Sequence, residues 1–427
     1  MTENAQVTAL DSGARVVTEH LESVRSIALG FFVKTGSRNE SPAQAGLSHF
    51  LEHLLFKGTD RFSSFEIDET FDAMGAEVNA GTGKETTSVY SRFMDRHLDR
   101  AFDVMQDMVL RPVYPDIDAE RQVVIEEIAM YEDEPSDKVH DVLADAIFGN
   151  HPLGRPIIGT AEVVGGVPIP DIAAYHDVRY VPGNVVVAAA GNVDHDKIVE
   201  MVNGAFAGGR ANGAFAEGPE PAPPVTAPKR CFFEKETEQY HLSLGAPGLA
   251  RADERRFALR ILDMILGGSM SSRLFQEVRE KRGLAYAVYS FSSQFADSGQ
   301  VGLYVGTRPD NVNEAMEVIG TELRKLASEG VTEAELERAR ENVKGRTTLA
   351  MESTFARMSR LGSSVLMDVP LLTLDEVLAK LDAVTMDEIR ALAAEFYDPE
   401  RMSAAGVGAD ESSFREALGA VSSSLAA

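Results

Sequence analysis

The segment Gly46-Leu-Ser-His49-Phe-Leu-Glu52-His53-Leu-Leu-Phe56 contains the pattern His-x-x-Glu-His. On a helix, positions i and i+4 lie on one face, so His49 and His53 can both reach one metal ion. Glu52 lies on the same face, close enough to take a proton from an attacking water. The neighbouring side chains are apolar: Leu47, Phe50, Leu51, Leu54, Leu55 and Phe56. The segment therefore predicts a helix that carries part of a catalytic metal site.

The alternative for this segment is a pair of core histidines on an amphipathic helix. With 9 His in 427 residues, chance produces His-x-x-x-His roughly 0.2 times per chain, and the added acid lowers this to roughly 0.03. The complete pattern therefore favours a metal site.

A second, acidic segment offers the third ligand that a hydrolytic zinc requires. Glu120 and Glu127 are two helical turns apart and share a face, whereas Glu126 is turned away by about 100°. Glu127 follows His53 by 74 residues (127 − 53). The alternative for these acids is a solvated helix edge.

The surrounding sequence predicts strands and helices in the order β-α-α-β-β-α-α, and this order occurs twice. Each pattern rests on strand-like runs of β-branched and aromatic residues followed by helical periodicity. In the first half the predicted elements are a strand at 26–35, helices at 45–56 and 65–74, a hairpin at 77–93 with its turn at Gly81-Thr-Gly83, and helices at 97–110 and 118–133. In the second half they are a strand at 241–249, helices at 253–266 and 271–281, strands within 285–306, and helices at 311–329 and from 332 onward.

A segment rich in proline and glycine separates the two halves. Residues 208–228 hold 5 Pro and 4 Gly among 21 positions and show no apolar periodicity, which is typical of a linker. The predicted domains are therefore 1–207, the linker 208–228, and 229–427. Each half is expected to form an α/β sandwich with one sheet covered by helices, so the fold class is α+β.

Composition restricts the function classes. The chain has 44% hydrophobic residues and a net charge of −26, from 41 Lys+Arg against 67 Asp+Glu. This charge argues against nucleic-acid binding and would favour basic peptides as partners. Cys231 is the single cysteine, which excludes a disulfide framework or a cysteine-rich metal site. With no signal-like N-terminus and no apolar run of about 18 residues, we expect no membrane span and a bacterial-type cytoplasmic location, with an organelle left open.

Together the two motifs carry a family resemblance. His49-x-x-Glu52-His53 followed by Glu120-(x6)-Glu127 resembles the inverted-motif zinc peptidases, the inverzincins. More narrowly it resembles the pitrilysin-type (M16) family, in the short-chain branch with the mitochondrial processing peptidase. The resemblance covers nearly the whole chain and includes the strings from Gly46 to Thr59 and from Pro152 to Thr160. It implies the LuxS/processing-peptidase-like metallohydrolase fold and zinc-dependent endopeptidase activity.

The resemblance assigns roles to individual residues. His49, His53 and Glu127 would bind one Zn²⁺ per chain, and Glu52 would be the general base. Glu120 would orient the ligand set without itself binding the metal.

The second half has no equivalent metal ligands in its sequence. When Gly58 is aligned with Gly267, and Glu120 with Glu337, the four positions of the motif hold side chains that do not bind zinc at neutral pH: Ala258, Ile261, Leu262 and Lys344. If the halves are duplicates, we expect only the first to bind metal.

Two further elements resemble substrate-binding parts of the family. Arg282 and Tyr289 match an Arg/Tyr pair seven residues apart, which offers donors to peptide carbonyls. Asn79 and Ala80 lie in a segment that resembles an edge strand to which an extended peptide adds. The alternatives are a surface arginine, a half-buried strand tyrosine and a simple packed hairpin.

The resemblance also implies how subunits are arranged. Short-chain members form a clamshell of two subunits around a chamber, which would restrict substrates to peptides and unfolded segments. Since this chain has both the metal motif and the Arg/Tyr pair, a homodimer with two equivalent sites is the simpler prediction. The alternatives are a non-catalytic subunit of the same family, and an enzyme that requires a different partner chain.

Overall fold

The computed structural model describes residues 5–207, 220–223 and 227–426. These residues form two compact units. Unit 1 is drawn from the ranges Met1–Ile128, Pro156–Glu220 and Thr347–Asp375, and unit 2 from Ala129–Arg155, Pro221–Arg346 and Glu376–Ala427.

Unit 1 is built on a six-stranded sheet with the order β1-β2-β6-β3-β5-β4. Only β2 and β6 pair in parallel, and the other neighbours are antiparallel. The strands are β1 (Ala5–Ala9), β2 (Arg15–His20), β3 (Ser26–Val33), β4 (Glu77–Thr82), β5 (Thr87–Met94) and β6 (Val185–Gly191). Strand β4 is therefore an edge of this sheet.

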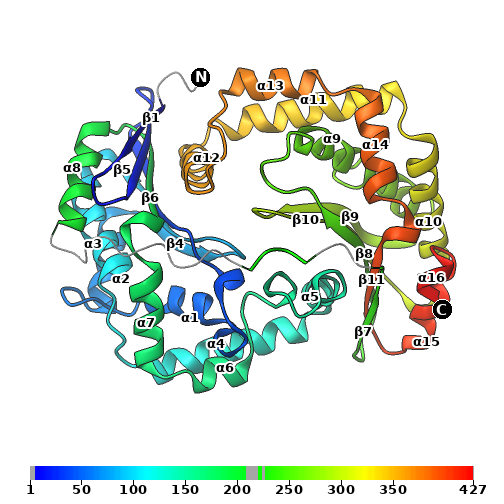
Figure 1. The fold of residues 1–427 in the computed structure, drawn as a ribbon, viewed down its shortest axis with the longest axis horizontal. Coiled ribbons are helices and arrows are strands. Elements are labelled where there is room, and N and C mark those ends of the chain that lie inside the picture. The colour runs from blue at the N-terminus through cyan, green and yellow to red at the C-terminus, as the bar shows by residue number, and fades with distance from the viewer. Residues whose placement is uncertain (1–4, 208–219, 224–226, 427) are drawn as a thin grey trace. The chain divides into compact units, whose positions relative to one another are not determined.

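Both faces of the unit 1 sheet are covered by helices. Successive strand residues point to opposite faces, so Leu29 and Phe31 of β3 pack in one core and Ala28 and Phe32 pack in another. The first core takes side chains from helices α1 (Leu47–Leu54), α2 (Ser64–Met74), α3 (Leu98–Leu110), α4 (Ile117–Asp133), α6 (Ala161–Gly166), α7 (Ile169–Arg179) and α8 (His195–Phe206). The second is closed by α12 (Thr354–Leu366), which Figure 1 shows on the opposite side of the sheet from α3 and α8.

Unit 2 repeats the topology of unit 1 in a five-stranded sheet with the order β7-β11-β8-β10-β9. The strands are β7 (Arg230–Glu234), β8 (Tyr240–Gly248), β9 (Ala285–Gln294), β10 (Gly299–Thr307) and β11 (Ser403–Gly408). Apart from the extra strand β1, both sheets have the order first-fifth-second-fourth-third, and in both the first and fifth strands pair in parallel. The predicted duplication and the α+β fold class are confirmed.

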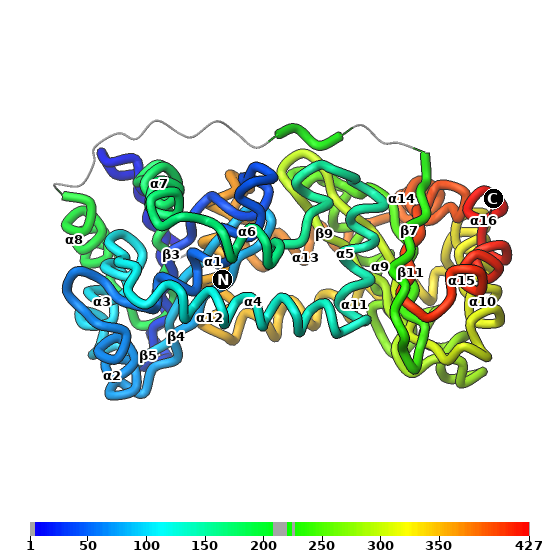
Figure 2. Tube along the Cα trace, turned by 90° about the horizontal axis from the view of Figure 1, so that it is seen from below, coloured from blue at the N-terminus to red at the C-terminus, as the bar shows by residue number. Residues whose placement is uncertain are grey.

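The unit 2 sheet is likewise covered on both faces. One core packs β8 and β10 against helices α9 (Arg256–Leu266), α10 (Val312–Glu329), α11 (Glu333–Ala350), α13 (Leu374–Asp382), α14 (Met386–Phe396), α15 (Glu411–Leu418) and α16 (Ser423–Ala426). The other face is covered by α5 (Pro135–Phe148), whose Val139 and Leu143 pack with Tyr304 and Val407. Figure 2 shows α5 alongside β11.

The two chain halves exchange a helix. Helix α5 comes from the first half of the sequence but belongs to unit 2, and α12 comes from the second half but belongs to unit 1. The compact units are therefore not simple N- and C-terminal halves. Most of the predicted linker 208–228, namely 208–219 and 224–226, lies outside the described residues, so the linker stays a prediction.

The predicted elements are present, with two corrections. The hairpin turn lies at 83–86 instead of at Gly81-Thr-Gly83, because the carbonyls of Gly83 and Lys84 accept hydrogen bonds from the amides of Ser37 and Arg38. The helix predicted at 271–281 is reduced to a π-helical segment, Phe275–Glu280. Among the described residues, no helix is both long and apolar enough to cross a membrane.

Candidate metal centre

Helix α1 begins at a carboxylate cap. Glu40 is buried, and its carboxylate accepts hydrogen bonds from the backbone amides of Gly46, at 2.8 Å, and Ser48, at 2.6 Å. The first amides of a helix lack partners within the helix and carry partial positive charge, so a buried carboxylate stabilises this end. Glu40 therefore fixes where the helix with the His-x-x-Glu-His motif starts.

Two glycines allow the segment before α1 and the loop before α6 to pack closely. Gly46 has φ +93° and Gly159 has φ +77°, a region that favours glycine. A Cβ on Gly159 would lie 2.3 Å from the carbonyl oxygen of Ala45, and one on Gly46 would lie 2.5 Å from that of Ile158. The start of α1 is thus packed directly against the loop before α6.

Helix α4 is held against α1 by a buried arginine. The guanidinium of Arg121 donates to the carbonyls of Val164 and Val167 and lies 5.4 Å from the ring centroid of Phe50. Because Phe50 is on α1, this contact sets the position of α4 beside the motif helix. The neighbouring residue, Glu120, is consequently directed toward α1.

Three side chains from α1 and α4 converge on one point. The Nε2 atom of His49 lies 3.7 Å from Oε1 of Glu127, and Nε2 of His53 lies 3.2 Å from Oε2 of Glu127. One ligand atom from each of these residues falls within 4.8 Å of the others. Glu126 is exposed. Among the described residues, this is the single cluster of its kind.

Hydrogen bonds around His53 leave its Nε2 atom available. The Nδ1 atom of His53 lies 2.9 Å from Oε1 of Glu120. The other carboxylate oxygen of Glu120 forms an ion pair with Nζ of Lys57 at 2.7 Å. A carboxylate on the second ring nitrogen fixes the ring orientation and raises its basicity as a ligand. The buried Nδ1 atom of His49 has no hydrogen-bond partner in the described structure.

Glu52 is beside the cluster and is oriented by Thr82. The Thr82 hydroxyl, on edge strand β4, donates to Oε2 of Glu52 at 2.5 Å. Burial raises the pKa of Glu52, against the opposing effect of the Thr82 hydrogen bond. A carboxylate with a raised pKa is a stronger base.

Burial, and to a smaller extent the adjacent His53, lowers the pKa of His49 to about 4, so this ring is neutral at pH 7.

The donor set fits a catalytic zinc. Two imidazole nitrogens and one carboxylate oxygen form the His₂Glu combination of hydrolytic zinc sites, in which a fourth position stays open. Both histidines reach the cluster through Nε2, which suits neutral imidazole ligands. The partly buried Glu127 can supply either oxygen.

The positions in unit 2 that align with the motif have other contacts. Ala258, Ile261 and Leu262 of α9 are buried in the hydrophobic core. Lys344 of α11 pairs with Glu341 and Asp382, both at 2.9 Å. These side chains pack in the core or form ion pairs, and that the second half binds no metal stays a prediction.

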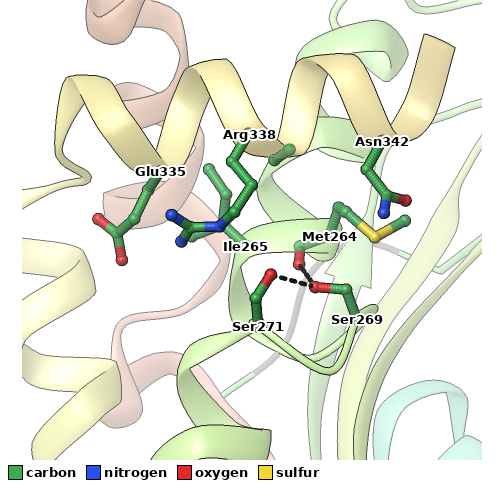
Figure 3. A pocket seen from close by; sticks show the side chains of 8 residues that line it. Met264, Ile265, Ser269, Ser271, Glu335, Arg338 and Asn342 are labelled. Atoms are coloured by element: carbon green, nitrogen blue, oxygen red, sulfur yellow. Dashed lines mark hydrogen bonds between the residues drawn. The ribbon is translucent and has the colours of Figure 1, made fainter. Parts of the chain in front are cut away.

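Unit 2 contains a small pocket between α9 and α11, lined by both polar and apolar side chains. Figure 3 shows the hydroxyls of Ser269 and Ser271, 3.3 Å apart, directed toward each other, with Arg338 and Asn342 on α11 across the pocket. Glu335, at one end of this pocket, forms an ion pair with Arg273 at 2.7 Å. The pocket has no histidine and does not resemble a metal site.

Three of the four predicted substrate-binding residues lie on edge strands of their sheets. Asn79 and Ala80 lie on β4, the edge of the unit 1 sheet. Tyr289 lies on β9, the edge of the unit 2 sheet, and Arg282 precedes that strand. The Arg282 guanidinium is held by Glu277, through its carbonyl at 2.7 Å and its carboxylate at 2.8 Å.

Sequence reasoning missed three residues that position the cluster: Glu40, Lys57 and Thr82. Glu40 precedes the motif by nine residues and looks like a loop acid. Thr82 follows the alternation of β4, in which Val78, Ala80 and Thr82 share the more buried face. That alternation could have indicated a polar side chain directed inward.

The chain matches two family profiles that lie one after the other along its sequence. Residues 15–161 match the profile described as insulinase (peptidase family M16), and residues 167–343 match the peptidase M16 inactive domain. An uncharacterized zinc protease of Streptomyces coelicolor is 46% identical to this chain, over 90% of it and 86% of the relative.

The chain belongs to the M16 peptidase family.

Other M16 relatives support the same assignment. An uncharacterized zinc protease of Bacillus subtilis is 42% identical over 90% of this chain and 94% of its own length. Among solved structures, a protease from Helicobacter pylori matches with a TM-score of 0.89 and 23% identity, over 95% of this chain and 99% of that one. A peptidase M16 inactive domain from Pseudomonas fluorescens matches with a TM-score of 0.86 and 22% identity, over 95% and 98%. The structural matches show that the fold is shared.

Proposed function

We propose that this M16 protein is a zinc-dependent endopeptidase that cleaves peptides and unfolded segments. The observation that carries the proposal is the convergence of His49, His53 and Glu127 beside the partly buried carboxylate of Glu52. The names of the relatives support zinc as the metal. One ion per chain is proposed because the described residues hold one such cluster.

His49, His53 and Glu127 would hold the zinc. When bound, Zn²⁺ would lower the pKa of a water molecule and polarise the scissile carbonyl. Glu52 takes a proton from the attacking water and then donates it to the leaving amine. Thr82 keeps the Glu52 carboxylate in one orientation, and Glu120 keeps the His53 ring in place through its Nδ1 atom.

Substrate binding uses main-chain contacts. An extended peptide would add to the β4 edge at Asn79 and Ala80 by backbone hydrogen bonds, a mode with weak sequence selectivity. Arg282 and Tyr289 would donate hydrogen bonds to substrate carbonyls. The net charge of −26 favours basic peptides.

The proposed assembly is a homodimer with two equivalent sites. Arg282 and Tyr289 would be supplied by the neighbouring subunit, so a Glu52→Gln chain mixed with an Arg282→Ala chain should regain part of the activity. A demonstrated mixed dimer that stays inactive would favour sites built within one chain. The proposed location remains the cytoplasm, which cell fractionation can test.

The decisive experiment compares wild type with Glu52→Gln by metal analysis and a peptide-library digest. We expect zinc to remain bound in the variant while cleavage collapses, and retained turnover would remove Glu52 from the mechanism. Glu127→Gln should lower zinc content far more than the control Glu126→Gln, because Glu126 is exposed. The reverse result would reassign the third ligand.

The competing function is a non-catalytic subunit. The profile matched by residues 167–343 is described as inactive, which agrees with the lack of ligands at the aligned positions of the second half. If the purified wild-type chain has no affinity for zinc, this second function is favoured.

A further inference from the structure

His140 contacts the hydroxyl of Tyr289 in unit 2. The Nε2 atom of His140, on α5, lies 2.9 Å from Oη of Tyr289, on edge strand β9. Helix α5 is the helix that the first half of the chain contributes to unit 2, where it packs on β8 and β11. A residue 149 positions earlier in sequence therefore reaches one member of the predicted Arg/Tyr pair.

The ring of Tyr289 is fixed by its neighbours on the sheet. Tyr304 is directly opposite on β10, and the two rings stack with centroids 4.9 Å apart. Tyr304 is buried, and its own hydroxyl bonds to Nδ1 of His241 at 2.8 Å. Tyr289, by contrast, keeps 37% of its surface exposed. The ring position is thus set by stacking, and His140 is the group that holds the exposed hydroxyl.

The orientation of the Tyr289 hydroxyl decides whether its proton can be donated to a substrate carbonyl. A phenol has one proton to donate. If Nε2–H of His140 donates to Oη, that proton is free for a substrate carbonyl. Burial lowers the pKa of His140 despite the opposing effect of Asp137, so the ring is neutral at pH 7 and carries one N–H, on Nε2 or on Nδ1. The other charged and titratable groups near this cluster are Glu134 of the loop before α5 and His241 of β8.

We propose that His140 is a positioning residue for Tyr289: it donates a hydrogen bond from Nε2 to Oη and directs the Tyr289 hydroxyl proton toward a substrate carbonyl. This inference rests on the proposed function, because it assumes that Tyr289 binds substrate. No motif in the sequence singled out His140, which has no second histidine three or four residues away.

The kinetic test uses a double-mutant cycle. We expect His140→Phe to lower kcat/KM by about 3- to 10-fold, as for loss of one hydrogen bond, and to have no further effect in a Tyr289→Phe background. His140→Gln retains a donor at a similar reach and should restore most of the activity. His241→Phe is the matched control, because it removes the neighbouring His–Tyr bond without touching Tyr289 and should change kcat/KM much less.

A second readout does not depend on activity. With ¹³Cζ-labelled tyrosine, the NMR signal that disappears in Tyr289→Phe should shift in His140→Phe and return toward its wild-type position in His140→Gln. An unshifted signal, a folded His140→Phe protein with wild-type kcat/KM, or an equal loss in both backgrounds would overturn the inference. A wild-type chain that cleaves no peptide although the Tyr289 signal responds would instead overturn the proposed function, and the positioning role with it.

Discussion

The hydroxyl of Thr82 lies 2.5 Å from Oε2 of Glu52, so an edge strand and the motif helix meet at the predicted general base. Thr82→Val keeps the shape of the side chain and removes this donor. We expect kcat to fall about tenfold because the carboxylate loses its fixed orientation, a loss typical of a hydrogen bond to a charged group. Zinc content should not change, and Thr82→Ser should recover activity. A Thr82→Val enzyme with normal kcat would exclude this role.

Glu120 supports His53 from the side opposite the cluster. Glu120→Gln should weaken zinc affinity by about 10- to 100-fold, as measured by competition with a chelator, because the ring loses its charged partner. Lys57→Met should act in the same direction but less strongly, since Lys57 touches only Glu120 in this group. The exposed Glu126→Gln is the control. Unchanged affinity in Glu120→Gln would show that the His53 ring is oriented by packing alone.

Gly159 permits the close approach of a loop to the start of α1. Gly159→Ala should destabilise unit 1 by about 2 kcal/mol or more, since φ is +77° and the new Cβ would meet the Ala45 carbonyl at 2.3 Å. Urea denaturation and zinc content should both report the loss. Gly204→Ala is the control: nothing lies within 4 Å of its Cβ, and it lies within α8. That variant should be neutral or stabilising by about 0.5–1 kcal/mol, and equal behaviour of the two variants would contradict the argument.

Stability near Glu335 should depend on pH. Burial raises the pKa of Glu335, but hydrogen bonds from Arg273 and Thr332 outweigh this and lower it to about 2. Because the folded pKa lies below the ordinary value of 4.5, the stabilisation is present above that value and is lost as the pH falls toward 2. Glu335→Gln should therefore cost about 1.5–3 kcal/mol at pH 7 and progressively less below pH 4.5.

The effect is measured by urea denaturation of wild type, Glu335→Gln and the control Glu337→Gln across this pH range. Glu337 is a suitable control because it forms an exposed i,i+3 pair with Arg340, and such pairs contribute little. A difference between Glu335→Gln and wild type that does not change with pH would contradict the assignment.

Local patterns predicted the elements on which the candidate site stands. The apolar run of β3, the helical spacing of His49 and His53, and the shared face of Glu120 and Glu127 are all properties of short segments. Spacing on a helix determines direction, so His49, His53 and the pair Glu120 and Glu127 could be selected without coordinates. The choice of Glu127 over Glu120 as the third ligand came from the family resemblance. Their roles as zinc ligands remain proposals that the variants above test.

Contacts between distant segments were beyond such reasoning. Periodicity shows that α5 and α12 have an apolar face but not which sheet that face covers, so the helix exchange was missed. The Thr82–Glu52 contact joins residues 30 positions apart on β4 and α1. The His140–Tyr289 contact joins residues 149 positions apart and depends on the placement of α5 in unit 2. The π-helical segment Phe275–Glu280 was also missed, because its residues have ordinary helical composition.

The reciprocal placement of α5 and α12 has a consequence for the integrity of the chain. The second hydrophobic face of each sheet is shielded from water by a helix that comes from the other half of the sequence. A polypeptide cleaved between Ala207 and Glu220 would give two fragments. The N-terminal fragment would still contribute α5 to the core of unit 2, and the C-terminal fragment would still contribute α12 to the core of unit 1. Such fragments would be expected to stay joined without a peptide bond, and neither would be a self-sufficient folding module.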